Sequence, residues 1–281
     1  MSYLMENRDE DLRLAIKTDP DVVKRQAAWA GIGPGMRVLD VGCGSGITTA
    51  ALADLVGQNG HVVGLDASEE RLAIAQEKFS APNISFVLHD IRKPYRSPIL
   101  FDAIWARFIL EYFRKEQRDV VANSITSLRI GGIACLIDTD NHSLGHHGEN
   151  ERVIATIEDI VKRLERDHNF DPYAGRKLYS HLHALGFTNI ACMIEPHHLI
   201  YDQLNEKDAY NWVRKLELTA RQSGCQFEAY SGEDFAHFAT PYEAFAAEFK
   251  AYFADPSRFC YTPLMILRGT KALKSIERMK S

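Results

Sequence analysis

The sequence predicts an α/β fold in which helices cover both faces of a mostly parallel sheet. Short apolar runs alternate with helix-like segments over residues 36–138, and this alternation is typical of parallel strands joined by helices. The runs are apolar throughout, as strands buried between two layers of helices must be. Between the first run and its helix, the stretch VLDVGCGSGITTAAL places three glycines in five positions. Together these observations predict an open parallel sheet with a glycine-rich turn after its first strand.

The elements of this first part follow from their start and stop signals. Asp19 and Pro20 begin a helix that ends at Gly31, because a capping carboxylate and a proline in the first turn favour a helix start. A Gly-Pro-Gly turn follows at residues 33–35, and Ser68 caps a later helix. The expected strands are residues 37–41, 61–66, 84–89, 101–106 and 133–138, and the expected helices are residues 47–56, 69–79 and 115–129.

The pattern changes after residue 138. Apolar residues recur at helical spacing over residues 151–166, a second helix is expected at 175–185, and a strand at 189–194. A long helical stretch over residues 206–253 carries a stripe of aromatic side chains, which we interpret as packing because it follows the helical period. A final strand is expected at 264–267. The organisation expected is a helical arm at residues 1–35 and one domain at 36–281, with helical elaborations at about 145–170 and 203–255.

Composition narrows the class of protein. A net charge of −5 and a pI near 6.1 argue against a general nucleic-acid binder, which needs a basic face. The five cysteines are scattered and never form a Cys-x-x-Cys pair, as in a reduced compartment. We find no leader with a basic start and an apolar core, and no apolar run near the ~20 residues that span a bilayer. We therefore expect a cytoplasmic protein without a membrane segment.

The glycine-rich turn is expected to bind a ligand. Gly42, Gly44 and Gly46 stand where a strand passes into a helix, at the carboxyl edge of the sheet, where open α/β sheets bind their ligands. Glycine lets a ligand approach the backbone, and a helix N-terminus offers unpaired N–H groups. Asp66 ends the next strand about twenty residues later, where a carboxylate can accept hydrogen bonds from both hydroxyls of a ribose.

Two kinds of ligand fit this arrangement. A dinucleotide fingerprint has the form G-x-G-x-x-G, so position 47 would be Gly or Ala, and here it is Ile47. A nucleoside with an amino-acid tail suits the spacing better, since Asp40 can lie near an ammonium group but would repel a pyrophosphate. An oxidoreductase that binds a dinucleotide stays the less favoured alternative.

The motifs along this half of the chain resemble those of class I S-adenosylmethionine-dependent methyltransferases. The resemblance extends over residues 36–195, and it is closest to small-molecule enzymes of the ubiquinone and menaquinone biosynthesis type. It implies a Rossmann-like, seven-stranded, mostly parallel sheet with an antiparallel last strand, helices on both faces and a helical insertion near the C-terminus. It rests on VLDVGCGSG, VVGLDAS, FVLHDI, FDAIWARFILEYF, LRIGGIACLIDTD and LHALGF, which occur in the family's order.

The same resemblance assigns residues to S-adenosylmethionine, whose product is S-adenosylhomocysteine. It places Asp66 on the ribose and Ala67 against the adenine, while Asp90 and the Ile91 backbone N–H read the adenine edge. It places Arg107 at the cofactor, just past the fourth strand. The residues expected at the methionine moiety are Asp40, Gly42, Gly44 and Gly46.

The methyl acceptor is expected above the fourth and fifth strands. That edge precedes DTDNHSLGHH, in which we take His142 as the candidate general base. A metal site in this cluster is the weaker interpretation, since no helical pair of ligands anchors it, and none is expected. The segment Ala106–Ile109 replaces the DPPY or NPPY of many enzymes that act on nucleobase or glutamine nitrogens. A small-molecule acceptor is therefore favoured; methylation of RNA or protein, or a regulator that binds S-adenosylmethionine without turnover, remain alternatives.

The N-terminal arm carries a further expectation. The stretch EDLRL at residues 10–14 is similar to a segment of related methyltransferases. The resemblance implies that the arm acts as a lid that closes the cofactor pocket, and that its arginine, here Arg13, meets the methionine carboxylate. A guanidinium pairs with a carboxylate through two hydrogen bonds. The alternative is a solvated helix in which Arg13 pairs with Asp9 or Glu10.

Overall fold

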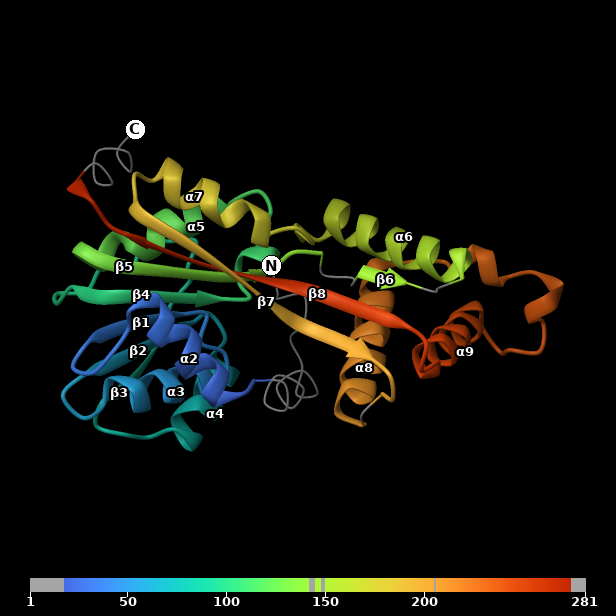
Figure 1. Ribbon diagram of the computed structural model, residues 1–281, viewed down its shortest axis with the longest axis horizontal. Helices are drawn as coiled ribbons and strands as arrows, with labels where there is room; N and C mark the ends of the chain where they lie inside the picture. The colour runs from blue at the N-terminus through green and yellow to red at the C-terminus, as the bar shows by residue number, and fades with distance from the viewer. Residues whose placement is uncertain (1–17, 142–144, 148–149, 205, 274–281) are drawn as a thin grey trace.

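Eight strands form one sheet in the part of the chain that the structure, a computed structural model, describes: residues 18–273 except 142–144, 148–149 and 205 (Figure 1). Their order is β3-β2-β1-β4-β5-β8-β6, with β7 beside β8. The bounds are β1 Arg37–Val41, β2 His61–Asp66, β3 Ile84–Leu88, β4 Phe101–Arg107, β5 Leu128–Thr139, β6 Gly145–His147, β7 Thr188–Tyr201 and β8 Phe259–Thr270.

The first five strands are parallel, and β8 runs antiparallel to both β5 and β7. The predicted mostly parallel sheet with an antiparallel last strand is confirmed, and the three-residue strand β6 is an addition to it. Because β1 to β4 are parallel, their carboxyl ends meet at one edge of the sheet.

Helices cover both faces of this sheet (Figure 1). α2 Pro20–Ala30, α3 Ile47–Val56 and α4 Glu69–Lys78 lie on one face; α5 Gln117–Ser124 and α7 Leu178–Ala184 lie on the other. Each face has its own apolar core, with Trp105 and Ile266 in the first and Phe101 and Leu136 in the second, all at most 1% exposed. The α2 helix begins at the predicted cap, where Asp19 accepts a hydrogen bond from the Asp21 N–H, and it ends at Gly31 in the left-handed conformation.

The far parts of β7 and β8 extend beyond the parallel strands and carry a separate group of helices (Figure 1). These are α6 Glu151–Asp167, α8 Glu206–Ser223 and α9 Pro241–Ala254. Together with the ends of the two strands they enclose a third apolar core. Phe245, Phe249 and Phe253 are buried in it, so the aromatic stripe does pack as its period indicated.

Several predicted boundaries were wrong. The stretch 206–253 is two helices, because Gly224 ends α8 in the left-handed conformation and α9 starts afresh with Thr240 as cap and Pro241 in its first turn. The 3-10 turns η4 Glu228–Tyr230 and η5 Glu233–Phe235 lie between them. The predicted helix 115–129 ends at Ser124, and η2 Ile125–Ser127 leads directly into β5.

The last two long strands were also predicted too short. β7 was expected at 189–194 and β8 at 264–267, yet they contain 14 and 12 residues. Beyond the first core the two strands pair with one another, and one face of this pair is exposed, as Tyr201 and Tyr261 show. The sequences of β7 and β8 therefore lack the continuous apolar runs of the buried parallel strands, which is why both strands were predicted too short.

Two further observations concern the described residues. None of the helices seen in them is long and apolar enough to cross a membrane. All five cysteines are free thiols.

Candidate functional site

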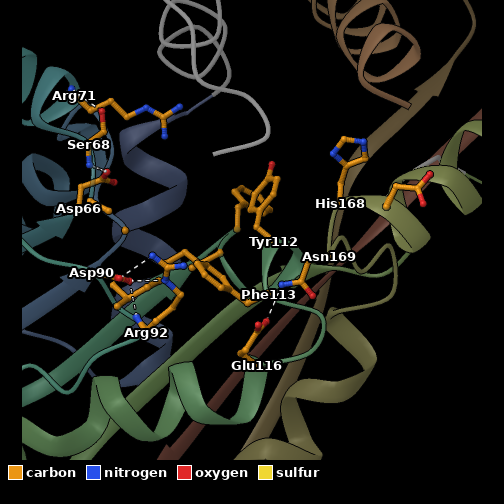
Figure 2. A pocket seen from close by; sticks show the side chains of 16 residues that line it. Asp66, Ser68, Arg71, Asp90, Arg92, Tyr112, Phe113, Glu116, His168 and Asn169 are labelled. Carbon is orange, nitrogen blue, oxygen red and sulfur yellow. Dashed lines mark hydrogen bonds and ion pairs between the residues drawn. The ribbon is translucent and has the colours of Figure 1, made fainter. Parts of the chain in front are cut away.

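The carboxyl ends of the parallel strands open into a cavity of about 550 Å³ (Figure 2), within the ~300–1,000 Å³ typical of small-molecule sites. One side comes from the ends of β1, β2 and β3, and the other from the segments after β4 and α6. The lining residues are Gly42, Asp66, Ala67, Ser68, Arg71, Asp90, Ile91, Arg92, Phe108, Ile109, Tyr112, Phe113, Glu116, Asp167, His168 and Asn169.

Glycine is present at the three positions after β1 for different structural reasons. All three have positive φ angles, 72° at Gly42, 54° at Gly44 and 88° at Gly46, a region that other residues rarely occupy. A Cβ on Gly42 would lie 2.6 Å from Ile109, and one on Gly46 would lie 2.9–3.0 Å from side chains of α4 and β3. Beside Gly44 there is open space. Gly46 is therefore required by packing, while Gly44 leaves room for a ligand.

Asp66 joins the end of β2 to this turn. One carboxylate oxygen accepts a hydrogen bond from the backbone N–H of Gly44 at 2.9 Å. The other accepts from the backbone N–H of Ser68 at 2.9 Å (Figure 2). Ser68 in turn caps α4 by accepting a hydrogen bond from the Arg71 N–H. A carboxylate oxygen can accept more than one hydrogen bond, so the side chain that holds the turn can still accept bonds from a ligand in the cavity.

At the end of β3, Asp90 forms an ion pair with Arg92 (Figure 2). The guanidinium donates to both carboxylate oxygens, at 2.9 and 2.8 Å, and these bonds lower the pKa of Asp90. Ile91 is buried at the cavity wall and Ala67 is exposed to it. The predicted adenine residues thus lie together, and the arginine two positions after Asp90 is a partner that the sequence analysis missed.

Asp40 lies behind the turn and does not line the cavity. It is 2% exposed, and the Thr49 hydroxyl donates to its carboxylate at 2.7 Å. Burial raises the pKa of Asp40 to about 7, and the nearby Asp66 adds to this, while Thr49 and Arg107 oppose it. A carboxyl group with such a pKa readily takes or releases a proton near neutrality, so a cation bound at the glycine turn would favour its ionised form.

Arg107 is the last residue of β4, at the edge of the sheet where the carboxyl ends of the parallel strands meet. Burial lowers its pKa to about 10, and Asp40, Asp138 and Glu195 oppose the shift, so the guanidinium stays charged at neutral pH. Its Nε is buried and has no hydrogen-bond partner among the residues that the structure describes. The guanidinium lies 4.3 Å from the ring centroid of Phe108, which lines the cavity.

Two further carboxyl groups, those of Glu111 and Asp138, are buried next to one another outside the cavity lining. Asp138, at the end of β5, accepts from the backbone N–H groups of Glu111 and Thr139 and is fully buried. Burial and the neighbouring Glu111 raise the pKa of Asp138 well above its usual range. Asp140 instead forms an ion pair with Arg176. Within the described residues we find no group of three or more His, Cys, Asp or Glu side chains that could hold a metal ion.

The structure brings most of the predicted cofactor residues together. Gly42, Asp66, Ala67, Asp90 and Ile91 line one cavity and Gly44 is bonded to one of them. The predicted residues Asp40, Gly46 and Arg107 lie outside its lining, and Arg13 and the candidate base His142 lie outside the described residues.

One side of the cavity was not predicted from the sequence. The segment after α6 lies against the segment after β4, because Asn169 donates to Glu116 at 2.7 Å (Figure 2). Asn169 also accepts from the backbone N–H of Lys115 at 3.0 Å. This places the neighbouring His168 in the cavity lining, across from Tyr112. The contact joins residues 53 positions apart, and no local pattern in the sequence signals it.

Comparison with known proteins agrees with this geometry. Residues 38–132 match the family described as methyltransferase domain. Over 80 residues the chain is 41% identical to "Probable cobalt-precorrin-6B C(15)-methyltransferase (decarboxylating)" of Thermoplasma acidophilum, a match that covers 26% of this chain and 38% of that protein. Over 94 residues it is 38% identical to the demethylmenaquinone methyltransferase of Bacillus cytotoxicus, with 29% and 40% covered. The chain thus spans about two fifths of the length of these relatives.

Among solved structures, phosphoethanolamine N-methyltransferase 2 of Haemonchus contortus, in complex with S-adenosyl-L-methionine, aligns with 93% of this chain and 52% of its own. The TM-score is 0.51 and the sequence identity 18%. At this identity the likeness shows the fold, which extends over nearly the whole chain.

Proposed function

Since the chain carries a class I S-adenosylmethionine-dependent methyltransferase domain, we propose that it transfers a methyl group from S-adenosylmethionine to a small-molecule acceptor. One observation carries the proposal: Asp66 holds Gly44 with its carboxylate in a cavity-lining position, and beside Gly44 lies open space. The turn therefore leaves room for a ligand directly beside the cavity-lining carboxylate.

The residues present fit the cofactor. Asp66 would accept from the ribose hydroxyls, Ala67 and Ile91 would flank the adenine, and Asp90 would read its amino group. Asp40 is buried behind the turn and has a pKa of about 7. Its ionised carboxylate would balance the positive charge of the ammonium group of the methionine moiety. The open space beside Gly44 would leave room for that moiety near the start of α3.

When bound, S-adenosylmethionine supplies a methyl carbon that its sulfonium already activates. The chain then has to orient the acceptor and exclude water, and such positioning is worth about 7–11 kcal/mol in well-aligned reactions. The aromatic residues Phe108, Tyr112 and Phe113 line the cavity beyond the cofactor residues, and they support an acceptor of partly apolar character, as do the quinone-type names among the relatives.

Calorimetry and product analysis test the proposal. We expect S-adenosylmethionine and S-adenosylhomocysteine to bind and NAD not to bind. With labelled S-adenosylmethionine and a pool of small metabolites, we expect labelled methyl product and S-adenosylhomocysteine in equal amounts. Binding without any S-adenosylhomocysteine formed would leave a regulator, and methyl label recovered only in RNA or protein would contradict the small-molecule acceptor.

A further inference from the structure

Phe108 has a backbone conformation that requires an explanation. Its φ is +57°, which is a genuine outlier for a bulky side chain and is energetically unfavourable. The conformation is held by a hydrogen bond from its N–H to the Ile137 carbonyl at 2.9 Å. Strain of this kind persists where the surrounding structure imposes it, often at ligand sites. Here it places an aromatic ring in the wall of the cavity.

The Phe108 ring begins a row of cationic and aromatic side chains, which we name the Phe108 wall. The Arg107 guanidinium lies 4.3 Å from the Phe108 centroid, and the His197 ring lies 4.8 Å from it. From there the row continues over β7 to α8. The further contacts are His197 to His198 at 4.1 Å, His198 to Trp212 at 4.8 Å, and the Lys215 ammonium over Trp212 at 4.5 Å.

The carboxylates nearest Arg107 are engaged elsewhere. Glu195 accepts hydrogen bonds from Arg25 and Gln26 of α2. Asp40 accepts from Thr49, and Asp138 accepts from two backbone N–H groups. Burial and the neighbouring Glu111 raise the pKa of Asp138, which favours its neutral form and weakens its compensation of the guanidinium.

Two donors in the wall are buried without a protein acceptor. The Nε of Arg107 and the Nε1 of Trp212 have no hydrogen-bond partner among the described residues. A buried donor that stays unpaired destabilises the fold, and it does so more strongly when it is charged. An oxygen of a ligand would remove this cost, and an anionic oxygen would also balance the charge of Arg107.

We propose that the Phe108 wall binds the methyl acceptor, and that the acceptor is a small planar molecule with an anionic oxygen, as in a phenolate or a carboxylate. This inference rests on the proposed function. The flat ring of Phe108, which lines the cavity, suits a planar body. Arg107 lies outside the lining but against that ring, where its positive charge attracts the anionic oxygen. A cationic amine would instead be repelled by this guanidinium.

The test uses full-length protein saturated with S-adenosylhomocysteine and three matched probes. These are 2-naphthoate, neutral 2-naphthamide and the cation 2-(aminomethyl)naphthalene, each titrated by calorimetry. We expect naphthoate to bind at least about tenfold more tightly than the other two, as a hydrogen bond to a charged group implies. Equal binding of the three probes, or preference for the amine, would overturn the proposal.

Arg107→Met should remove the preference, and Arg107→Lys should retain part of it. Arg129→Met is the matched control, because Arg129 pairs with Asp102 at the other end of β4 and should leave the preference unchanged. Thermal unfolding of each variant establishes that it is folded. A preference that survives in Arg107→Met contradicts the proposal.

A second arm separates the acceptor from the carboxylate of the cofactor itself. S-adenosylhomocysteine carries that carboxylate and 5′-methylthioadenosine lacks it. If Arg107→Met weakens the binding of S-adenosylhomocysteine but not that of 5′-methylthioadenosine, Arg107 contacts the carboxylate of the cofactor and our inference is wrong. If wild-type protein fails to bind S-adenosylhomocysteine, the proposed function fails, and the probe titration without it still decides whether the wall prefers an anion.

Discussion

The carboxylate of Asp66 accepts a hydrogen bond from the backbone N–H of Gly44 at 2.9 Å, which joins the end of β2 to the turn after β1. Both residues were expected to bind the cofactor, one through its side chain and one through the lack of a side chain. The bond makes them a single unit, because the carboxylate that would meet the ribose also fixes the backbone beside the methionine moiety.

We expect Asp66→Ala to weaken S-adenosylhomocysteine binding at least about tenfold, since hydrogen bonds to a charged group are each worth ~1.5–3 kcal/mol. Calorimetry measures the affinity. Asp102→Ala is the matched control: Asp102 also accepts from a backbone N–H, that of Arg37 at 2.8 Å, but it lies outside the cavity lining. Near wild-type affinity in Asp66→Ala would show that Asp66 does not contribute to ligand binding.

The glycine turn offers a comparison between two neighbouring positions. Gly44→Ala adds a methyl group to open space, so we expect a loss of about 1–2 kcal/mol from its positive φ and at least a tenfold loss of S-adenosylhomocysteine affinity. Gly46→Ala adds one against Ala75, Phe79 and Phe86, so we expect a larger loss of stability, roughly 2–4 kcal/mol.

Urea unfolding and calorimetry together measure both effects. The expected result is a crossed pattern, in which Gly44→Ala is the weaker binder and Gly46→Ala the less stable protein. Folded Gly46→Ala should bind S-adenosylhomocysteine within a few fold of wild type. Unchanged affinity in Gly44→Ala would mean that the space beside it holds no part of the ligand.

These two glycines also illustrate what sequence can and cannot predict. The spacing of the turn and Asp66 identified the strand, the helix and the edge of the sheet, because these are set by residues within about twenty positions. From the sequence alone, Gly42, Gly44 and Gly46 were all expected to have the same role. Their roles differ because a Cβ on Gly42 would meet Ile109 and one on Gly46 would meet Phe86, which come from other strands and loops.

The contact between Asn169 and Glu116 on one side of the cavity was not predicted for the same reason. The contact of Phe108 with His197 was not predicted either. Both join segments far apart in the chain. A base was expected in DTDNHSLGHH because this stretch begins at the carboxyl end of β5. Of its acidic residues, Asp138 is buried outside the cavity lining and Asp140 pairs with Arg176.

Asp40 predicts a pH dependence of stability. Its pKa is about 7 in the folded protein and near 3.8 in the ordinary case, so between pH 4 and 7 the folded state holds a proton that the unfolded chain has released. The free energy of unfolding should therefore fall as pH rises through this window. Asp40→Asn should flatten that slope, by on the order of a few kcal/mol over the window. Urea unfolding at pH 5, 6, 7 and 8 measures it, and identical slopes in both proteins would contradict the buried, protonated state.

The same carboxyl group predicts proton release on binding. If the ammonium of the methionine moiety lies near Asp40, binding of S-adenosylhomocysteine at pH 6 should ionise it and release up to one proton. Calorimetry in two buffers of different ionisation enthalpy detects this proton. Asp40→Asn should bind without the release, and 5′-methylthioadenosine, which lacks the ammonium, should show none with wild type. Proton release by both ligands alike would assign it to another group.

The last prediction concerns residues 1–14, which lie outside the described residues. The α2 helix that follows is anchored without them: Asp19 caps its start, and Gln26 donates to Glu195 of β7 at 2.9 Å. Deleting residues 1–14 should therefore leave a folded protein. If Arg13 pairs with the methionine carboxylate, the deletion should lower S-adenosylhomocysteine affinity at least about tenfold, and Arg13→Ala in the full chain should account for most of that loss.

Two controls make this deletion decisive. Removal of residues 1–7 keeps Arg13 and should bind nearly as tightly as the full chain. Binding of 5′-methylthioadenosine, which has no carboxylate, should be insensitive to Arg13→Ala, whereas a loss for both ligands would point to closure over the cavity rather than to a carboxylate contact. Wild-type affinity in the protein without residues 1–14 would return Arg13 to the surface, paired with Asp9 or Glu10 as in the alternative interpretation.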